Sequence, residues 1–592
     1  MKEKCIIFGA SQYGHRAYKV LNEIYEIIGF ADNDSKKWGK EFCEKIIYKP
    51  EKLLDMQDLH IVIASQYYSA INSQLHSMGL KNIKVFYYCG KVLEDIDNKG
   101  YKIYSISEKK LFQDCIFDKE KIRKVRDNFS ENYEHIGELK KIRLKETNRK
   151  KVLFCAYNFP PTGGSGVQRS LKFVKYLIKF GYEPIVLTVG EHEHKFGEDY
   201  TLLEEIKGIQ VIRIDNVNFI PEILSKDEQQ EIFNLYAGIV QSEDWIDNYL
   251  EVIKSDANLK LIPDNRICWV NECLKQIEGI LDLTEITAVY TTGEPFSTYI
   301  LGFYLKQKYG MKWVQDYRDP WMTNNHYIRN YYKNDASTME LQQILEKELT
   351  READAIIVVA KAFMGEYTER YGVDKEKIIE ITNGYDEEDF RGIEVPINKN
   401  NKFTLCYNGS LYVNRSPLNL LNIINGLIEN NKLNKDEILW IFNGTLENQW
   451  RKELEKRDKY KIIQYNGYLN HIESIKETMQ ADILVLFGEE GEGTHFVYTG
   501  KIFEYIRMKR KILSFSSKGG VLEDILNKTK TGKNFEYDDF DGISKWLMDN
   551  YTVWKNEENR SVFGDDIVIK KYSREYTTSQ LAKVFDKVLE RN

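Results

Sequence analysis

Long apolar runs, paired cysteines and prolines are scarce or missing in this sequence. No apolar stretch approaches the roughly 20 residues that a membrane-spanning helix needs, and the opening residues 1–4 do not have the pattern of a signal peptide. The eight cysteines are scattered, and none forms a Cys-x-x-Cys pair. This distribution fits a reducing compartment and argues against a disulfide scaffold or a cysteine zinc site. We therefore expect a cytoplasmic protein.

A strong charge of one sign is also missing. The 592 residues carry a formal net charge of -7, and 42% of them are hydrophobic and 30% charged, as in soluble globular proteins. A mild negative charge does not indicate a general nucleic-acid binder, so we expect no nucleic-acid partner. The length exceeds what one hydrophobic core supports and indicates about three or four domains.

Residues 1–98 have the pattern of a small parallel-sheet domain. Four strand-like runs alternate with helical segments, at residues 4–9, 27–31, 60–64 and 83–87. Gly9 and Gly14 stand where a dinucleotide-binding loop has its first and third glycines, and Ser11 replaces the middle one. Asp32 stands where an acidic residue would meet a ribose. Two interpretations stay open: a domain that binds a nucleotide or NAD, and a structural or docking domain.

Residues 99–150 contain little glycine and dense charge, as in the run 140–145. Ile136, Leu139, Ile142 and Leu144 have a loosely helical spacing within this stretch. The pattern favours a charged helical linker. The alternative is a basic amphipathic helix that makes a peripheral contact with the inner surface of the cytoplasmic membrane.

A second domain is expected over residues 151–397. Its first strand, 152–156, leads into a loop with Gly163, Gly164, Ser165 and Gly166, and then into a helix. Glycines let backbone amides approach a ligand, and a helix start favours an anion. Arg169 adds a positive charge close by. Because the Gly-Lys-Ser/Thr of a Walker motif is absent, we predict a phosphate-binding loop of another kind.

Charged residues follow another strand of this domain. Asp316, Arg318 and Asp319 come at the end of the run 313–315. The carboxyl ends of parallel strands are where such sheets bind ligands, so these residues indicate a ligand-binding edge. A purely structural ion pair is the alternative. Asn383 marks a tight turn after a later strand.

A metal-like run also occurs in this domain. Glutamate and histidine alternate over residues 191–194. In a polar stretch such a run is more typical of a solvated loop than of a metal site, and we predict no metal site.

A third domain is expected over residues 398–570. Its first strand, 403–407, ends before Gly409 and Ser410, and Arg415 lies on the loop that follows. The remaining residues, 571–592, have the length and position of a helix that crosses back onto the preceding domain.

The same domain contains a strand, a flexible loop and a helix start in succession. The buried strand 483–487 leads through a glycine-rich acidic loop to Thr499, Gly500, Lys501 and Glu504. A helix start with unpaired N–H groups and a lysine suits a phosphate. A glutamate one turn later could accept hydrogen bonds from sugar hydroxyls. We interpret this stretch as half of a nucleotide-sugar site.

Four motifs, in this order, resemble those of GT-B glycosyltransferases, close to glycosyltransferase family 4. They occupy residues 160–169, 316–321, 381–386 and 499–505. The resemblance covers residues 151–592 and implies two Rossmann-like domains with a cleft between them. It also implies an enzyme that transfers a sugar from a nucleotide donor, with a UDP-sugar favoured, with retention of configuration and without a required metal. The expected acceptor is a glycan, a lipid-linked molecule or another glycoconjugate, in bacterial surface polysaccharide biosynthesis.

The resemblance assigns roles to individual residues. Glu504 matches the second glutamate of the family's E-x7-E signature, which holds the donor ribose, whereas the first glutamate falls on Phe496. The catalytic candidates are Asp316, Arg318, Asp319 and Glu504, on the two sides of the cleft. The donor-binding candidates, together with Glu504, are Gly164, Ser165, Gly166, Asn383, Gly409, Ser410, Arg415, Thr499, Gly500 and Lys501.

Residues 1–98 resemble the small Rossmann-like domains described as fragments of nucleoside-diphosphate-sugar epimerases and those that open PglD-type sugar acyltransferases. The matching residues are 9–11, 14 and 29–34. The chain as a whole is therefore expected to be an α/β protein with three Rossmann-like parallel-sheet domains. Two alternatives to a simple transferase stay open: a catalytically degenerate nucleotide-sugar-binding protein, and a bifunctional enzyme whose N-terminal domain modifies the donor.

Overall fold

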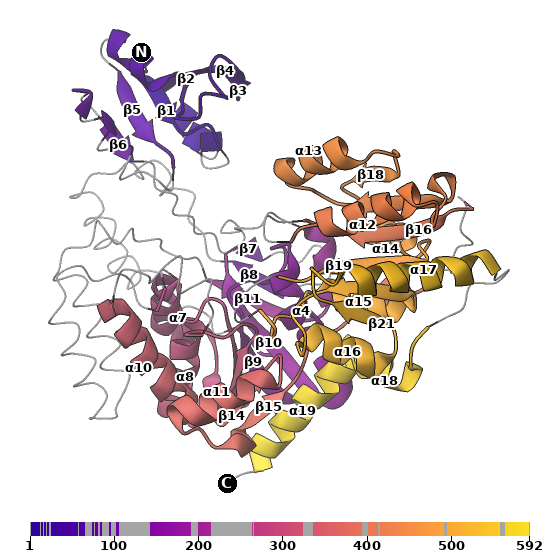
Figure 1. The fold of residues 1–592 in the computed structure, drawn as a ribbon. Coiled ribbons are helices and arrows are strands. Elements are labelled where there is room, and N and C mark those ends of the chain that lie inside the picture. Colours follow the sequence, from indigo (N-terminus) through magenta and orange to yellow (C-terminus); the bar gives the residue numbers. More distant parts are fainter. Residues whose placement is uncertain are drawn as a thin grey trace.

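The structure is a computed structural model of the whole chain. The residues it describes are 2–11, 14–15, 17–18, 21–22, 25–56, 59–65, 71, 74–75, 77–80, 83–85, 94–95, 102–105, 142–190, 199–214, 263–264, 266–323, 336–393, 401–411, 415–489, 494–556 and 563–590. The described strands form three sheets (Figure 1). Within these residues, no helix combines the length and the apolar character that membrane crossing requires.

The N-terminal sheet has the order β3-β4-β2-β1-β5-β6. Its strands are β1 (Lys4–Phe8), β2 (Glu26–Ala31), β3 (Glu41–Phe42), β4 (Lys45–Tyr48), β5 (His60–Ile63) and β6 (Ile83–Val85). All pairs are parallel except β3 with β4. The central strand β1 is apolar on both faces: Cys5 and Ile7 belong to one buried cluster, and Ile6 and Phe8 to another.

A nine-stranded sheet forms the first lobe, with the order β15-β14-β13-β12-β9-β10-β11-β8-β7. Its strands are β7 (Glu94–Asp95), β8 (Lys102–Ser105), β9 (Lys150–Cys155), β10 (Tyr182–Val189), β11 (Gln210–Ile214), β12 (Ile286–Gly293), β13 (Lys312–Tyr317), β14 (Ala355–Val358) and β15 (Ile378–Glu380). Its described α-helices are α4 (Ser165–Leu177), α7 (Ile267–Ile280), α8 (Thr298–Tyr309), α10 (Ala336–Glu352) and α11 (Ala362–Tyr371). The order reverses between β9 and β12, which is the topological switch point of this sheet.

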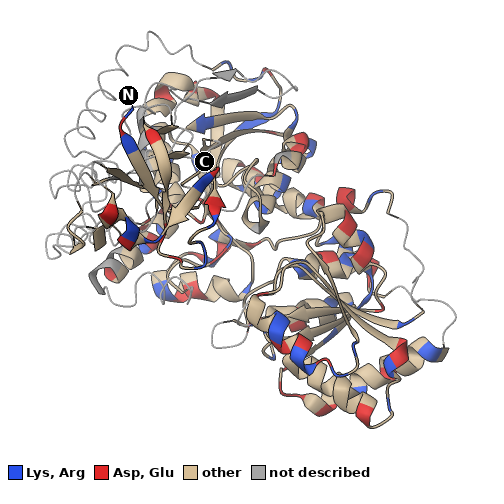
Figure 2. Ribbon diagram, turned by 90° about the horizontal axis from the view of Figure 1, so that it is seen from above, with Lys and Arg blue, Asp and Glu red and all other residues tan. Residues whose placement is uncertain are grey.

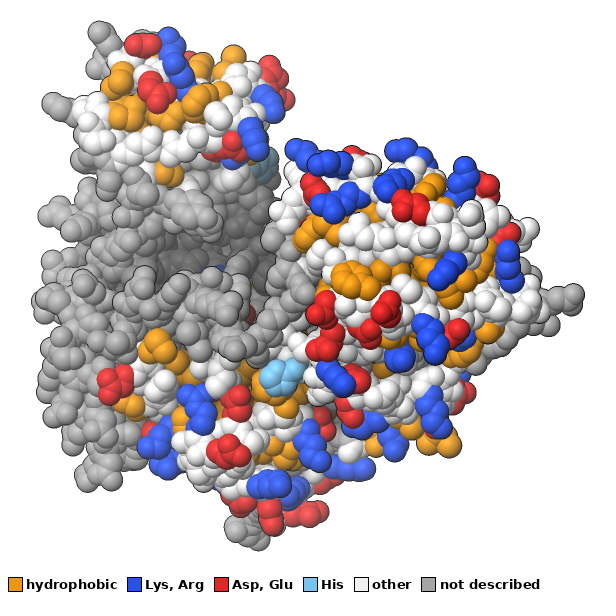
Figure 3. Space-filling model, viewed as in Figure 1, with side chains coloured by type: hydrophobic (Ala, Val, Ile, Leu, Met, Phe, Trp, Pro, Cys, Tyr) orange, Lys and Arg blue, Asp and Glu red, His pale blue; other side chains and the backbone are white. Residues whose placement is uncertain are grey.

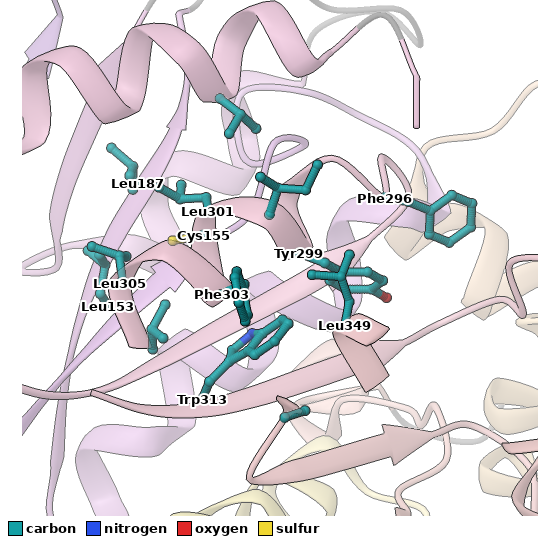
Figure 4. Close-up of a cluster of buried hydrophobic side chains, with 14 of the residues drawn as sticks. Leu153, Cys155, Leu187, Phe296, Tyr299, Leu301, Phe303, Leu305, Trp313 and Leu349 are labelled. Atoms are coloured by element: carbon teal, nitrogen blue, oxygen red, sulfur yellow. The ribbon is translucent and has the colours of Figure 1, made fainter. Parts of the chain in front are cut away.

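Side-chain alternation explains the two layers of helices in this lobe. Leu153 and Cys155 of β9 face one apolar cluster, shown in Figure 4, which also contains Trp313 and Leu349. Val152 and Phe154 face the opposite cluster, to which α4 contributes. A strand buried on both faces is the arrangement that parallel sheets require.

The predicted helical linker differs from the structure where the structure describes it. Residues 102–105 form β8, which pairs in parallel with β11 of the first lobe. Residues 142–147 contain no helix; Leu144 is buried, and the Ile142 N–H donates to the Ile280 carbonyl. A dense charge pattern indicates solvent exposure but does not distinguish a helix from an extended segment. The rest of the predicted linker, with the membrane-contact alternative, lies outside the described residues.

A third sheet forms the second lobe, with the order β18-β17-β16-β19-β20-β21. Its strands are β16 (Phe403–Asn408), β17 (Ile438–Asn443), β18 (Ile463–Gly467), β19 (Ile483–Phe487), β20 (Lys511–Phe515) and β21 (Gly532–Phe535). Its α-helices are α12 (Leu418–Glu429), α13 (Asn448–Arg457), α14 (His471–Thr478), α15 (Lys501–Met508), α16 (Val521–Thr529), α17 (Phe540–Asn556) and α18 (Asp566–Lys570). Counted along the chain, this order is that of a doubly wound Rossmann sheet, with its switch point between β16 and β19.

The C-terminal helix α19 (Arg574–Glu590) lies along the first lobe (Figure 1). Leu581 and Phe585 share a buried cluster with Leu171 of α4. The Tyr182 hydroxyl donates a 2.6 Å hydrogen bond to the Asp586 carboxylate. This helix, which follows the second lobe in the sequence, therefore packs on the first lobe.

The prediction of an α/β chain with three Rossmann-like parallel sheets is confirmed. The two later sheets form the two-lobed arrangement that the GT-B resemblance implies. Basic and acidic residues are interspersed on the helices of both lobes (Figure 2). Lysine and arginine side chains gather over α13 and β18 in Figure 3, where Arg451 and Arg457 pair with Glu455 and Glu453 at 3.1 and 3.0 Å.

Candidate functional site

The switch point of the second lobe brings two loops together at the carboxyl edge of its sheet. Gly409 directly follows β16, and the loop after β19 ends at Gly500, where α15 begins. Ligands of doubly wound sheets bind at such an edge. The predicted residues Gly409, Ser410, Arg415, Thr499, Gly500, Lys501 and Glu504 all belong to these loops or to the first turn of α15.

Lys501 is a cation in a confined place at the start of α15. Its Nζ lies 5.4 Å from the centre of the Tyr407 ring. A Cβ on Gly409, whose φ is +105°, would stand 2.3 Å from the Lys501 Cε, so only glycine leaves room for this side chain. Burial lowers the pKa of Lys501 to about 8, and the positive charge of Arg415 adds to this effect. The negative charge of a bound anion would oppose both effects and favour the protonated lysine.

Arg415 is the second cation at this edge. Its side chain is largely buried, with an Nη2 atom 2.9 Å from the Glu489 carboxylate. Thr499 is also buried, and its hydroxyl has no hydrogen-bond partner among the described residues. Two cations, a buried hydroxyl and a helix start therefore converge on one edge, a combination that suits a diphosphate. Ser410 contributes through its backbone, since its carbonyl accepts from the Tyr407 hydroxyl at 2.8 Å.

Glu504 lies one turn into α15, beside His471, a histidine that belongs to none of the sequence motifs. The His471 Nε2 atom is 3.9 Å from the Glu504 Oε1 atom and 3.3 Å from the Asp389 Oδ2 atom. Burial raises the pKa of Glu504, whereas His471 opposes that effect. The hydrogen bond to Asp389 raises the pKa of His471 to about 8. An imidazolium between two carboxylates therefore holds Glu504 in place near neutral pH.

This arrangement predicts a pH-dependent contribution of His471 to stability. Because its pKa in the folded protein is raised, the contribution is fully present below pH 6.5 and is lost as the pH rises through about 8. The side chain is 52% exposed, so solvent screening limits the effect to about 1 kcal/mol or less. We expect His471→Gln to lower the melting temperature at pH 6 and to leave it unchanged at pH 9. An equal loss at both pH values would contradict this assignment.

The first lobe places its glycine loop against Arg318. The Arg318 Nη1 atom donates to the Gly166 carbonyl at 3.1 Å, and a Cβ on Gly166 would stand 2.5 Å from that same nitrogen. Gly164, with φ +92°, is the N-cap of α4, and Ser165 is the first residue of that helix. The Arg318 Nε atom lies 3.1 Å from the carboxylate of Asp319, which is 45% exposed. The structure therefore brings the predicted glycine loop and these two charged residues together.

Asp316 lies apart from them, fully buried beneath α4. Its carboxylate accepts two hydrogen bonds from Arg169, at 2.7 and 2.9 Å, and a third from the Tyr290 hydroxyl. Asp316 and Arg169 are 0% and 1% exposed. Such a closed ion pair favours the structural alternative for Asp316, as a residue that positions its neighbours.

Arg169 also fixes the segment that links the lobes. It donates to the Ile381 carbonyl at 2.9 Å and to the Thr382 carbonyl at 3.0 Å. The Asn383 side-chain oxygen accepts from both Arg169 and Arg574, each at 3.4 Å. Asn383 thus lies between two buried arginines. Burial, followed by the charge of Arg169, lowers the pKa of Arg574 to about 10.

Lysines of α4 bind the next part of the same segment. Lys172 lies 2.7 Å and Lys175 3.2 Å from the Asp386 carboxylate, which is itself almost fully buried. Burial alone would raise the pKa of Asp386, but Lys172 and Lys175 lower it well below its usual range. A connected set of charges therefore runs from α4 through Asp386 and Asp389 to His471 and Glu504. Sequence spacing could not reveal this set, because its members come from four separate elements.

Phe496, which stands in place of the first signature glutamate, contacts the other lobe. Its ring centre lies 5.4 Å from that of Phe363 in α11. Phe496 is partly buried against the apolar cluster of the first lobe. An aromatic residue here therefore has a packing role in the structure.

In the N-terminal sheet, Asp32 interacts with the glycine loop itself. Its carboxylate accepts from the Ala10 N–H at 2.9 Å and lies 2.9 Å from the Lys37 Nζ atom. A Cβ on Gly9 would clash with the Ala64 carbonyl oxygen at 2.4 Å, and one on Gly14 with the Gly9 carbonyl oxygen at 1.9 Å. These glycines, followed by Ser11, permit close backbone packing, and Asp32 stabilises their loop. This geometry favours the structural interpretation of the motif.

No metal centre emerges from the part of the chain that the structure describes. There, no group of three or more His, Cys, Asp or Glu side chains is placed to hold a metal ion. The run 191–194 lies outside the described residues.

Comparisons with known proteins found only distant likenesses. A family model described as C2185-like, N-terminal, matches residues 1–86, and thus concerns the N-terminal sheet alone. No curated protein matches the sequence.

Among solved structures, a glycosyltransferase from Rickettsia africae is 16% identical to this chain, with a TM-score of 0.46. The match covers 75% of this chain and 100% of the Rickettsia chain. A sucrose-phosphate synthase from Thermosynechococcus elongatus is 11% identical with a TM-score of 0.47, over 75% and 100% of the two chains. HepE from Anabaena, in complex with UDP and glucose, is 12% identical with a TM-score of 0.45, over 74% and 100%. At these scores, none of the likenesses carries an argument about activity or substrate.

Proposed function

We propose that this chain is a glycosyltransferase that moves a sugar from a nucleotide donor, with a UDP-sugar favoured, to a glycan, lipid-linked or other glycoconjugate acceptor. The observation that carries the proposal is the convergence of Lys501, Arg415 and the start of α15 at a switch point, with Glu504 one turn away. This set matches the two halves of a nucleoside diphosphate sugar: anionic phosphates and hydroxyl-rich rings. We place this activity in the cytoplasm, in the synthesis of bacterial surface polysaccharide.

In this proposal the residues of the second lobe stabilise the departing nucleoside diphosphate. Negative charge grows on the phosphate as the bond to the sugar breaks, and preorganised donors lower the energy of that state. Lys501, Arg415 and the backbone N–H groups near Thr499 and Gly500 supply those donors. Glu504 accepts hydrogen bonds from the donor ribose while His471 holds it. The proposal assigns the phosphate charge to these side chains and invokes no metal.

The first lobe supplies the acceptor side. We place Gly164, Ser165 and Gly166 against the donor phosphate. Arg318, which donates to the Gly166 carbonyl, and the neighbouring Asp319 would lie on the acceptor side. Retaining hydrolases place two carboxylates across the bond, whereas we propose attack on the face from which the diphosphate departs. A phosphate oxygen of the leaving group then takes the acceptor proton, and configuration is retained.

Removing the cation of Lys501 tests this assignment. We expect Lys501→Ala to lower transfer by about 100-fold or more, because a preorganised charge is lost from the transition state. Glu504→Gln is expected to weaken donor binding. The measurements are the release of UDP from UDP-sugars in the presence of an acceptor and the thermal shift produced by UDP.

Lys509→Ala is the matched control, because Lys509 lies at the other end of α15 and pairs with Asp566 at 2.6 Å. Both site variants should retain the far-ultraviolet circular dichroism of the parent protein. Full transfer activity in a folded Lys501→Ala protein would refute the site.

One observation favours a second candidate function. Phe496 removes a carboxylate that the family uses for the donor sugar, so the chain could bind nucleotide sugars without transferring the sugar. UDP-dependent stabilisation without any release of UDP, across a panel of sugars and acceptors, would establish that alternative.

A further inference from the structure

The loop that precedes α15 is fixed on one side by its own lobe. The Val521 N–H donates to the His495 carbonyl at 2.8 Å. A Cβ on Gly520 would stand 2.9 Å from the same carbonyl oxygen, so the loop lies directly on the turn that begins α16. This contact leaves the opposite side of residues 494–498 facing the first lobe.

On that opposite side the loop carries a small apolar surface. Phe496 and Tyr498, together with Val521, are partly buried against the apolar cluster of the first lobe. Phe496 makes the ring contact with Phe363, at an interplanar angle of 57°. Phe363 is the second residue of α11, whose Tyr367 and Tyr371 follow at four-residue steps and belong to the same cluster. Phe496 thus docks on Phe363, at one end of a row of aromatic residues on α11.

The docked residue is close in sequence to the proposed phosphate site. Only two residues separate Phe496 from Thr499, and Lys501 follows at the helix start. Tyr498 belongs at the same time to the core of the second lobe and contacts Phe503 with a ring separation of 5.3 Å. A displacement of Phe496 would therefore be transmitted to the residues that meet the donor.

We propose that Phe496 is a positioning residue that docks the donor loop onto α11 and so holds the two lobes together around the nucleotide sugar. This inference rests on the proposed function. It also assigns a role to the residue in place of the signature glutamate: interlobe packing replaces a sugar-binding carboxylate. Recognition of the donor sugar then comes from neighbouring groups rather than from this side chain.

Kinetics of four variants test the positioning role. Phe496→Ala is expected to raise the donor KM by about five- to tenfold, the range that one interlobe aromatic contact supports. Phe496→Leu should stay within about twofold of the parent. Phe496→Glu, which restores the family signature, should resemble Phe496→Ala. Val497→Ala, at an exposed neighbouring position, is the control and should leave the donor KM unchanged. A lower donor KM in Phe496→Glu would overturn the proposal.

A second experiment does not depend on catalysis. The sequence has glutamates at positions 489, 490 and 492, a residue type after which a glutamyl endopeptidase cuts, and mass spectrometry identifies any cuts. Phe363→Ala and Phe496→Ala should each raise the cleavage rate by about fivefold, and the double variant no further, because both remove the same contact. If the cleavage rate of the double variant rose by the product of the two single effects, the two side chains would act independently and the docking contact would be refuted. If every protein, including the parent, fails to transfer sugar, the proposed function is refuted. The comparison of cleavage rates in the single and double variants still tests the Phe496–Phe363 contact.

Discussion

Asp316→Ala is expected to lower the free energy of unfolding by about 3–5 kcal/mol. Asp316 accepts two hydrogen bonds from Arg169 and one from Tyr290 at a place with no solvent access. Without the carboxylate, the guanidinium of Arg169 stays buried without its main counter-charge. Its positive charge would also oppose that of the nearby Arg574 more strongly.

Urea unfolding at pH 7, followed by tryptophan fluorescence, measures this loss. Asp319→Ala is the matched control, because the Asp319 carboxylate is 45% exposed and its removal should change stability by no more than about 0.5 kcal/mol. Asp319→Ala should instead reduce sugar transfer if Asp319 lines the acceptor side. Equal stabilities of the two variants would show that the Asp316 ion pair contributes little.

Glu346→Gln is expected to stabilise the protein at pH 8 by about 3 kcal/mol. Burial raises the pKa of Glu346 from 4.5 to about 7, although the hydrogen bond from Tyr371 opposes the shift. Between pH 4.5 and about 7, the Glu346 carboxyl therefore keeps a proton in the folded protein that it releases in the unfolded chain. Stability falls as the pH rises from about 4.5 to 7, because the carboxylate must ionise inside the first lobe. A neutral amide avoids that cost and can still accept the 2.6 Å hydrogen bond from Tyr371.

The test is a comparison of melting temperatures across pH. The difference between Glu346→Gln and the parent should be small at pH 4.5 and should grow up to pH 8. Glu340→Gln changes an exposed glutamate of the same helix and should melt like the parent at every pH. A difference that does not vary with pH would show that Glu346 ionises as readily in the folded lobe as in the unfolded chain.

Much of the second lobe's candidate site could be predicted from local sequence. Gly409, Thr499 and Lys501 each follow a buried strand or begin a helix, and parallel strands end at one edge of their sheet. The local sequence pattern therefore predicted that these three residues lie close together. The pattern did not predict that His471, Asp389 and Arg574 lie near the site, because these charged side chains come close to it only when separate elements pack. A lone histidine at a helix start carries no sequence signal that distinguishes it from a surface residue.

Two predicted features changed once packing was known. Asp316 and Asp319 belong to one sequence motif, but Asp316 is buried beneath α4 whereas Asp319 is 45% exposed, because Asp316 lies within β13 and Asp319 lies beyond its end. The sequence predicted a helical linker over residues 99–150, but Lys102–Ser105, within that range, pairs with β11 in the first-lobe sheet. This strand forms by pairing with β11, which lies more than 100 residues away in the sequence. The spacing of residues within 99–150 cannot reveal such a partner.

The sequence by itself determined the α/β class, the three parallel sheets and the location of the glycine loops, since these follow from alternating apolar runs and from short-range turn chemistry. Only the tertiary structure decided that Arg169 closes over Asp316, that His471 contacts Glu504, and that Phe496 packs on Phe363. Those contacts join residues 33 to 147 positions apart and depend on how sheets and helices pack rather than on the spacing of residues along the chain.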